Sequence, residues 1–327
     1  MENGTFVISL DFELYWGVRD VVSLEHYKEN LKGVRLVIPA LVDIFNKYKI
    51  HATFATVGFL FFKNKKELLN SVPLLCPTYE NENLSPYISH VHSIGENESS
   101  DIYHYAWSLI DLLEKNHQEI STHTFSHYYC LEKGQTANQF KNDIIAAKQI
   151  GIERGIQLES IIFPRHQFND EHLKICYAQG IKTYRGNQKS FVHTPLVGNE
   201  KAYFRRLIRI IDSYINLLGH NTYHIDCIPF DSMLNIPASR FLRPYSRKLK
   251  FLDKLRLNRI LKEMTYAAKE KRVYHLWWHP HNFGLNLEEN LSFLDKILQH
   301  YNKLHSSFEF ESLSMKELHA KLYNNSL

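Results

Sequence analysis

Short apolar runs alternate with stretches of helical periodicity along the chain, and this alternation limits the fold more than any other feature. Runs of strand length occur at residues 5–10, 51–60, 117–122, 159–164, 181–184, 273–278 and 308–310. The stretches between them place apolar residues at helical spacing, at 34–48, 105–116, 136–155, 170–180, 247–271, 287–304 and 314–323. Repeated strand–helix units predict an α/β fold with a parallel sheet and helices outside it.

Polar side chains follow four of these strands, at the point where each strand ends. Asp11 and Glu13 end the first run, and the clusters 123–127, 164–166 and 279–281 follow later runs. Chemistry gathers at the carboxyl ends of strands in parallel-sheet folds. We therefore expect the four clusters to converge on one mouth. The polar, turn-rich segment 76–104 is predicted to be an insertion loop over that mouth.

The clusters at 11–13 and 123–127 have the side chains of a metal site. Side chains alternate along a strand, so Asp11 and Glu13 should point to one side and Phe12 to the other. His123 and His127 would be neighbours if a helix begins there. One carboxylate and two imidazoles suit a divalent metal with open positions for water. An isolated pair of histidines at this spacing is more often ordinary surface, but the combined set favours a metal site.

Composition narrows the classes of function. The net charge of +4 is too small to indicate nucleic-acid binding by itself, and no nucleic-acid partner is expected. Cys76, Cys130, Cys176 and Cys227 are widely scattered, as is typical of reduced thiols. The N-terminal residues show no signal peptide, and no apolar stretch approaches the roughly 20 residues that span a bilayer. We expect a cytoplasmic protein.

The motifs resemble those of the polysaccharide deacetylase family, the NodB-like carbohydrate esterases of family 4. The family's first motif is an acid pair at the end of the first strand. Its second is His-Ser/Thr-x-x-His, matched here by HTFSH at 123–127, and HATFATVGFL at 51–60 is similar to the strand between them. The resemblance covers roughly the whole chain. It implies a divergent member, cytoplasmic because no signal peptide is seen, with residues 1–327 forming one catalytic domain built as a distorted (β/α) barrel of about seven strands.

The resemblance also implies roles for the clustered residues. The family's first acid is the general base and its second binds metal, which makes Asp11 the base and Glu13 a metal ligand beside His123 and His127. The second acid is usually an aspartate directly after the first, whereas here it is a glutamate one residue further on, so the two roles are open to exchange. The expected metal is zinc, with cobalt, iron and nickel as alternatives.

Later motifs match less closely. The arginine that orients the base in the family is assigned to Arg165 in FPRHQFN, although the residue order differs. The family's strand ending in Leu-His is matched by HLWWHPHNFG, with His279 as proton donor and His281 as a second candidate. The family's aspartate-and-tryptophan motif has no clear counterpart, and YRGN at 184–187 occupies its region. Sugar-binding faces are expected from Trp16, Trp278 and His281, and also from Tyr15, Trp277 and Phe283, with core packing for whichever of Trp277 and Trp278 points inward.

The implied activity is that of a metal-dependent carbohydrate N-deacetylase. It would remove the N-acetyl group from an N-acetylated sugar, free or linked to a nucleotide or lipid, in surface-glycan synthesis. The same site would serve a formamido sugar or a cyclic amide, and a non-catalytic glycan-binding relative stays open. The basic stretch 239–272 is interpreted first as an outer helix with a solvated face. The sharper hypothesis is attraction to an anionic partner, including peripheral contact with a membrane.

Overall fold

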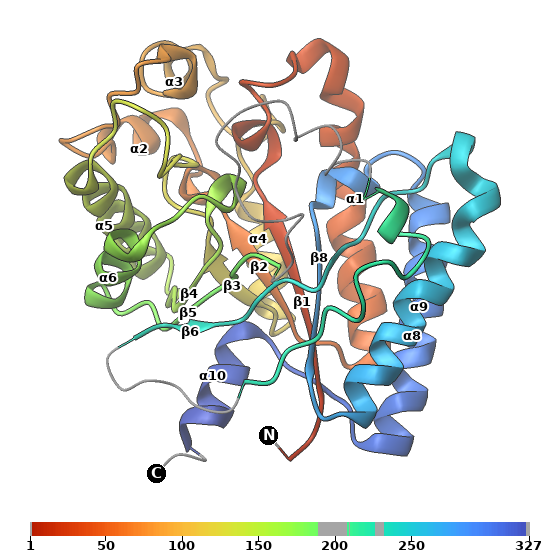
Figure 1. Cartoon of the computed structure of the whole chain (residues 1–327). Helices are drawn as coiled ribbons and strands as arrows, with labels where there is room; N and C mark the ends of the chain where they lie inside the picture. Colours follow the sequence, from red (N-terminus) through yellow and green to blue (C-terminus); the bar gives the residue numbers. More distant parts are fainter. Residues whose placement is uncertain (1, 189–207, 209, 226–231, 325–327) are drawn as a thin grey trace.

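The computed structural model describes residues 2–188, 208, 210–225 and 232–324 (Figure 1). Within them a parallel sheet has the strand order β6-β5-β4-β3-β2-β1-β8-β7, with β9 beside β1. The strands are β1 (Thr5–Phe12), β2 (Ala52–Thr56), β3 (Glu119–Thr122), β4 (Ser160–Ile161), β5 (Thr183–Tyr184), β6 (Leu234–Asn235), β7 (Arg240–Phe241), β8 (Val273–Trp278) and β9 (Glu311–Ser312). Because every pairing is parallel, their carboxyl ends share one edge.

The two outermost strands, β6 and β7, are joined by residues 236–239, which curl the sheet into a barrel. The N–H of Ile236 donates to the Tyr184 carbonyl on β5, the N–H of Ala238 donates to the Gly186 carbonyl just after β5, and the N–H of Ser239 donates to the His275 carbonyl on β8. The predicted distorted (β/α) barrel is confirmed, with nine described strands in place of about seven. The extra strands, β6 and β7, have two residues each, too few for a periodic sequence pattern.

Helices surround the outside of the curled sheet (Figure 1). The α-helices are α1 (Leu24–Tyr48), α2 (Lys65–Asn70), α3 (His90–Ser93), α4 (Trp107–Lys115), α5 (Ala137–Glu153), α6 (Asp170–Ala178), α8 (Asp253–Lys269), α9 (Leu287–Phe308) and α10 (Met315–Asn324). The short 3-10 helices are η1 (Leu14–Gly17), η2 (Gly58–Phe61), η3 (Glu82–Leu84), η4 (Pro164–His166), η5 (Arg247–Leu252) and η6 (Pro280–Phe283). Figure 1 shows α8 and α9 on one flank and α5 and α6 on the opposite flank.

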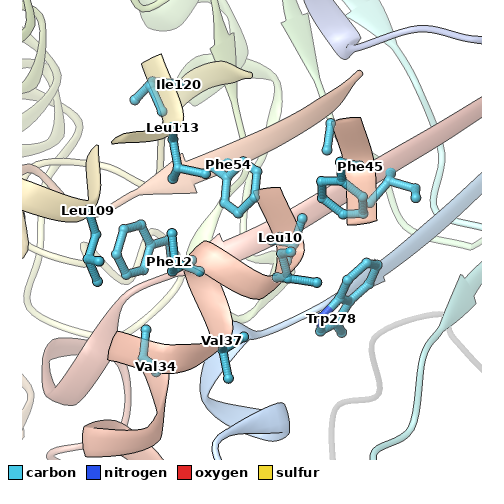
Figure 2. Close-up of a cluster of buried hydrophobic side chains, with 14 of the residues drawn as sticks. Leu10, Phe12, Val34, Val37, Phe45, Phe54, Leu109, Leu113, Ile120 and Trp278 are labelled. Carbon is cyan, nitrogen blue, oxygen red and sulfur yellow. The ribbon is translucent and has the colours of Figure 1, made fainter. Parts of the chain in front are cut away.

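The central strand β1 is buried at every position. Leu10 and Phe12 pack against Val34 and Val37 of α1, beside Phe54 of β2 (Figure 2). Helices and barrel interior cover the two faces of the strand, which explains why its sequence is nearly all apolar rather than alternating. Asp11 breaks this pattern although it is buried, because its side chain lies at the mouth of the barrel.

Segment 76–104, predicted as a loop, contains the short helices η3 and α3 and packs on the turn that follows β1. The Tyr15 N–H donates to Tyr103 O at 3.2 Å, and the Trp16 indole donates to His104 O at 2.9 Å. The segment thus holds in place the turn that carries Glu13. The single-domain organisation of residues 1–327 stays a prediction.

Several predicted boundaries differ from the structure, two of them at strands. The run at 51–60 ends as a strand at Thr56, because Gly58 begins η2. The strand expected at 308–310 lies at Glu311–Ser312, because α9 continues through Phe308 and ends on Glu309 in the left-handed conformation. Across the described ranges, no helix is long and apolar enough to cross a membrane. Cys76, Cys130 and Cys176 are free thiols, and Cys227 lies outside the described residues.

Candidate metal centre and active site

The end of β1 sends alternate side chains in opposite directions. Phe12 enters the core (Figure 2), whereas Asp11 and Glu13 lie in the barrel mouth, each 4% exposed. The Glu13 carboxylate occupies space beside Gly17, where a Cβ would lie 2.0 Å from the Glu13 carboxyl carbon. Glycine at position 17 therefore leaves the room that the buried carboxylate needs.

Glu13, His123 and His127 converge on one point. The Nε2 atoms of His123 and His127 lie 3.3 Å and 3.2 Å from the same oxygen, Oε2 of Glu13. One donor atom from each residue lies within 4.8 Å of the other two, and all three residues are buried. Two imidazole nitrogens and a carboxylate oxygen facing one point are a donor set that zinc and similar divalent ions accept.

The two histidines are neighbours, with ring centres 5.0 Å apart, although no helix begins at this position. Residues 123–127 form a loop after β3 in which Thr124 and His127 have φ values of 64° and 59°. For a β-branched residue such as Thr124 this left-handed conformation is unfavourable, so surrounding contacts must impose it. The Thr124 hydroxyl accepts from the Tyr128 N–H at 2.7 Å, and the Thr124 carbonyl accepts from the Gly58 N–H at 3.0 Å.

A buried acid on α5, Asp143, holds the middle of this loop. Its carboxylate accepts from the Phe125 N–H at 2.7 Å, from the Ser126 N–H at 3.2 Å and from the Ser126 hydroxyl. Burial raises the pKa of Asp143 to about 7, although these three donors favour the ionised form. Asp143 thereby fixes the chain between the two candidate ligands.

The ring orientation of His123 suits metal binding. Its Nδ1 lies 2.7 Å from the carbonyl oxygen of Ile162, which can only accept. Nδ1 must therefore carry the proton, which leaves the lone pair of Nε2 directed at Glu13. A buried carbonyl that sets the tautomer in this way is a common partner of metal-binding histidines. The residues present therefore fit a divalent metal.

Asp11 is paired with Arg185, not with Arg165. The Nη1 and Nη2 atoms of Arg185 donate to Oδ1 and Oδ2 of Asp11, both at 2.7 Å, and Arg185 is 1% exposed. Burial alone would raise the pKa of Asp11, but Arg185, His279 and His123 together hold it well below its usual range. Asp11 is therefore a buried, aimed carboxylate at neutral pH.

The assignment of Arg165 as the partner of Asp11 was wrong. Arg165 pairs with Asp20 and Glu132, and its guanidinium lies 4.1 Å from the ring centre of Tyr129. It follows β4, as predicted, but it lies in η4 with a φ of 52°, and its side chain goes to these two acids. Arg185 was missed because the two-residue strand β5 gives only a weak pattern. Its position directly after that strand, in YRGN, was the available signal.

Further hydrogen bonds inside the barrel hold the Arg185 guanidinium in position. Its Nη1 donates to the Ser9 hydroxyl at 3.0 Å, and Ser9 Oγ lies 2.8 Å from Nε2 of His275. His275 is fully buried, and burial lowers its pKa to about 3, so it is neutral. A chain of polar groups inside the barrel thus aligns the guanidinium with Asp11.

His279, directly before η6, faces both acids, and His281, within η6, faces Glu13. Nε2 of His279 lies 3.7 Å from Asp11 Oδ2 and 3.7 Å from Glu13 Oε1, and its side chain is 23% exposed. Nδ1 of His281 lies 4.0 Å from Glu13 Oε1, and the two imidazole rings stack with centres 4.9 Å apart. His279 is the more open of the two histidines, since the side chain of His281 is only 5% exposed.

The structure corrects two predicted sugar-stacking residues. Trp278 is fully buried among Leu10, Phe45 and their neighbours in the core (Figure 2), and Trp16 is 1% exposed. Neither ring has a face open to a ligand. Trp277 points the other way from Trp278, toward the mouth, where its ring lies 4.3 Å from the Arg185 guanidinium and 5.8 Å from the His279 ring.

Comparisons with known proteins identify the architecture. The sequence matches no family model, and no curated protein is similar to it in sequence. Solved structures are similar in fold. A Mycobacterium smegmatis structure assigned to the polysaccharide deacetylases aligns with 99% of this chain and 92% of its own, at 10% identity and a TM-score of 0.62.

Two further structures agree. One assigned to the polysaccharide deacetylases of Pseudomonas aeruginosa PAO1 gives 10% identity and a TM-score of 0.53, covering 98% of this chain and 90% of its own. PuuE allantoinase gives 9% identity and a TM-score of 0.55, covering 98% and 89%. The order and direction of the strands, the curled parallel sheet and these likenesses lead to one conclusion: the chain has the distorted (β/α)-barrel fold of the polysaccharide deacetylases.

Proposed function

We propose that this protein is a metal-dependent hydrolase that removes the N-acetyl group from an N-acetylated sugar. One observation carries the proposal. The candidate ligands Glu13, His123 and His127 meet beside a separate carboxylate, Asp11, which Arg185 keeps ionised. If both carboxylates bound the metal, none would be free to act as a base. Here Asp11 pairs with Arg185 and is not among the candidate ligands.

Glu13, His123 and His127 would hold the metal. When bound there, a divalent ion supplies Lewis-acid polarisation of the amide carbonyl and lowers the pKa of bound water toward about 7. The bidentate pair with Arg185 occupies both oxygens of Asp11. This pairing supports a role for Asp11 in proton transfer and for Glu13 at the metal, one of the two arrangements that the sequence left open.

Asp11 would take the proton of the attacking water. A positioned general base contributes typically about 10²–10⁴ in rate. Its paired arginine cannot lose its own proton, so Asp11 remains an acceptor. His279 is placed to donate a proton to the departing sugar amine, because its Nε2 faces the acids and it is the more exposed histidine of the pair.

We place the sugar at the mouth, beside Trp277, Phe241 and His281. The rings of Trp277 and Phe241 lie 4.7 Å apart and continue toward His279. Aromatic faces next to a hydrolytic centre suit the apolar face of a sugar ring. A sugar carried on a nucleotide or lipid in cytoplasmic surface-glycan synthesis, and zinc as the metal, belong to the same proposal.

A second candidate is hydrolysis of another non-peptide C–N bond, such as that of a formamido sugar or a cyclic amide. The likeness in fold to PuuE allantoinase supports it. The chemistry at the metal would be the same, and only the group beside the aromatic wall would differ.

Metal analysis of the purified protein, followed by a panel of N-acetyl sugars, tests the proposal. We expect about one zinc per chain and release of acetate from at least one sugar. His123→Ala should abolish both, while His92→Ala, an exposed histidine on α3, should change neither. Formate or ammonia in place of acetate would favour the second candidate. Full metal retention in His123→Ala, or bound metal with no hydrolysis of any substrate, would contradict the proposal.

A further inference from the structure

An exposed apolar surface occurs where β7 leads into α8. The 3-10 helix η5 buries none of its residues in the described structure. Phe251 is 77% exposed, and Leu249 and Leu255 are 39% and 45% exposed. Single exposed apolar residues are ordinary, but these three lie within seven positions of one another, across η5 and the first turn of α8, and form a patch.

The same positions carry unpaired positive charge. The exposed cations Arg247, Lys248, Lys250 and Lys254 form no ion pair with any acid of the described ranges. The one acid among them, Asp253, pairs with Arg256 at 2.9 Å. We define the basic tip as Arg247, Lys248, Leu249, Lys250, Phe251, Lys254 and Leu255.

The basic tip lies at the mouth end of the barrel. Helix α8 leads into β8, which is parallel to β1, so the start of α8 lies at the carboxyl ends of the strands (Figure 1). The Phe241 ring lies 6.1 Å from the His279 ring. Arg247 follows Phe241 by so few residues that even a fully extended backbone would keep its Cα within about 20 Å of that of Phe241.

We propose that the basic tip binds the surface of an anionic phospholipid bilayer and turns the barrel mouth toward it. Each lysine or arginine near such a surface raises binding by about fivefold, and apolar side chains between the cations insert at the headgroup boundary. A nucleic-acid backbone would pair with the cations but would leave Phe251, Leu249 and Leu255 uncovered. The mixture of charge and apolar area therefore favours a lipid surface.

What membrane binding would mean for the choice of substrate rests on the proposed function. A hydrolase held with its mouth against a bilayer suits an N-acetylated sugar attached to a lipid carrier. Vesicle binding itself needs no hydrolysis, so Asp11→Asn should bind vesicles normally while releasing no acetate. Vesicle binding therefore tests the membrane inference, and acetate release tests the proposed activity, so that the failure of one can be told from the failure of the other.

The experiment is sedimentation of the full chain with phosphatidylcholine vesicles, with or without about 30 mol % phosphatidylglycerol. We expect binding only to the anionic vesicles, and its loss when NaCl rises from about 20 mM to about 300 mM. Lys248→Gln/Lys250→Gln should weaken binding by about 25-fold, and Phe251→Ser by about tenfold.

The matched control is Lys141→Gln/Lys174→Gln, which removes two exposed cations from α5 and α6 on the opposite flank (Figure 1). It should bind as the wild type does. Equal weakening by this control, or no binding to anionic vesicles at low salt, would overturn the inference. So would tighter binding to a DNA duplex than to vesicles, or a dimer in sedimentation equilibrium that Phe251→Ser dissociates.

Discussion

Replacing Arg185 by methionine tests the central pairing of the site. Methionine has a similar length but no charge, so the change leaves Asp11 buried without its partner. The wild-type pair has two charge-assisted hydrogen bonds of 2.7 Å between residues that are 1% and 4% exposed. Removing one member of a buried ion pair costs about 3–5 kcal/mol of folding free energy. We expect a loss of this size, measured by chemical denaturation at pH 7.

The pH dependence follows from the sign of the shift. In the wild type the pKa of Asp11 lies well below its usual range, so its contribution to stability is complete above the unfolded pKa of about 3.9 and is lost as pH falls through the folded pKa. In Arg185→Met, burial acts without the arginine and raises the pKa of Asp11. The difference in stability between the two proteins should therefore be largest near neutral pH and shrink as the pH falls through the raised pKa of Asp11 in the variant.

Catalysis should respond in the same direction. The acid limb of kcat/KM should move to higher pH in Arg185→Met, and at neutral pH the rate should fall by about 10²–10⁴, the usual contribution of a general base. Arg185→Lys should lie between, because a lysine cannot donate to both carboxylate oxygens in fork geometry.

Arg165→Met is the matched control. Arg165 is 36% exposed and pairs with Asp20 and Glu132, so its loss should leave the acid limb in place. The reasoning would be refuted if Arg165→Met moved the acid limb and Arg185→Met did not.

Three further predictions concern how the site is built. Asp143→Asn places an amide N–H group against the N–H donors of Phe125 and Ser126. We expect it to lower the free energy of unfolding by about 2–4 kcal/mol and to weaken zinc binding, measured by titration, by about 10–100-fold. The control Asp111→Asn, at an exposed pair with Lys115, should cost under about 1 kcal/mol. Gly17→Ala puts a methyl group into the Glu13 carboxylate, so bound metal, measured by mass spectrometry, should be lost, and full retention would contradict the position of Glu13. Chelation should lower the melting temperature, since a ligand at about 100 times its Kd stabilises by about 2.7 kcal/mol; an unchanged melting curve for zinc-loaded and chelated protein would argue against the metal.

The sequence was sufficient for the framework of the site. Asp11 and Glu13 interrupt a strand that is otherwise apolar, and the pleat of a strand alone determines that they share a side opposite Phe12. His123 and His127 follow another strand, and parallel strands bring their carboxyl ends together. These are local rules that act over a few residues, so they can be applied without knowing the fold.

The residues that hold the site's side chains in position could be found only in the tertiary structure. Nothing local distinguishes Arg165 from Arg185, since both follow short strands; the difference is that β5 directs Arg185 into the barrel, where Ser9 and Asp11 receive it. Asp143 is a single acid in a helix, and its role appears only where α5 crosses the histidine loop. Likewise, only the packing of α1 and β2 shows that Trp278 is core and Trp277 is not. The sequence alone determined which residues end the strands, because backbone geometry acts between neighbours. Only the folded chain decided which of them become partners, because ion pairs and burial depend on distances between segments far apart in sequence.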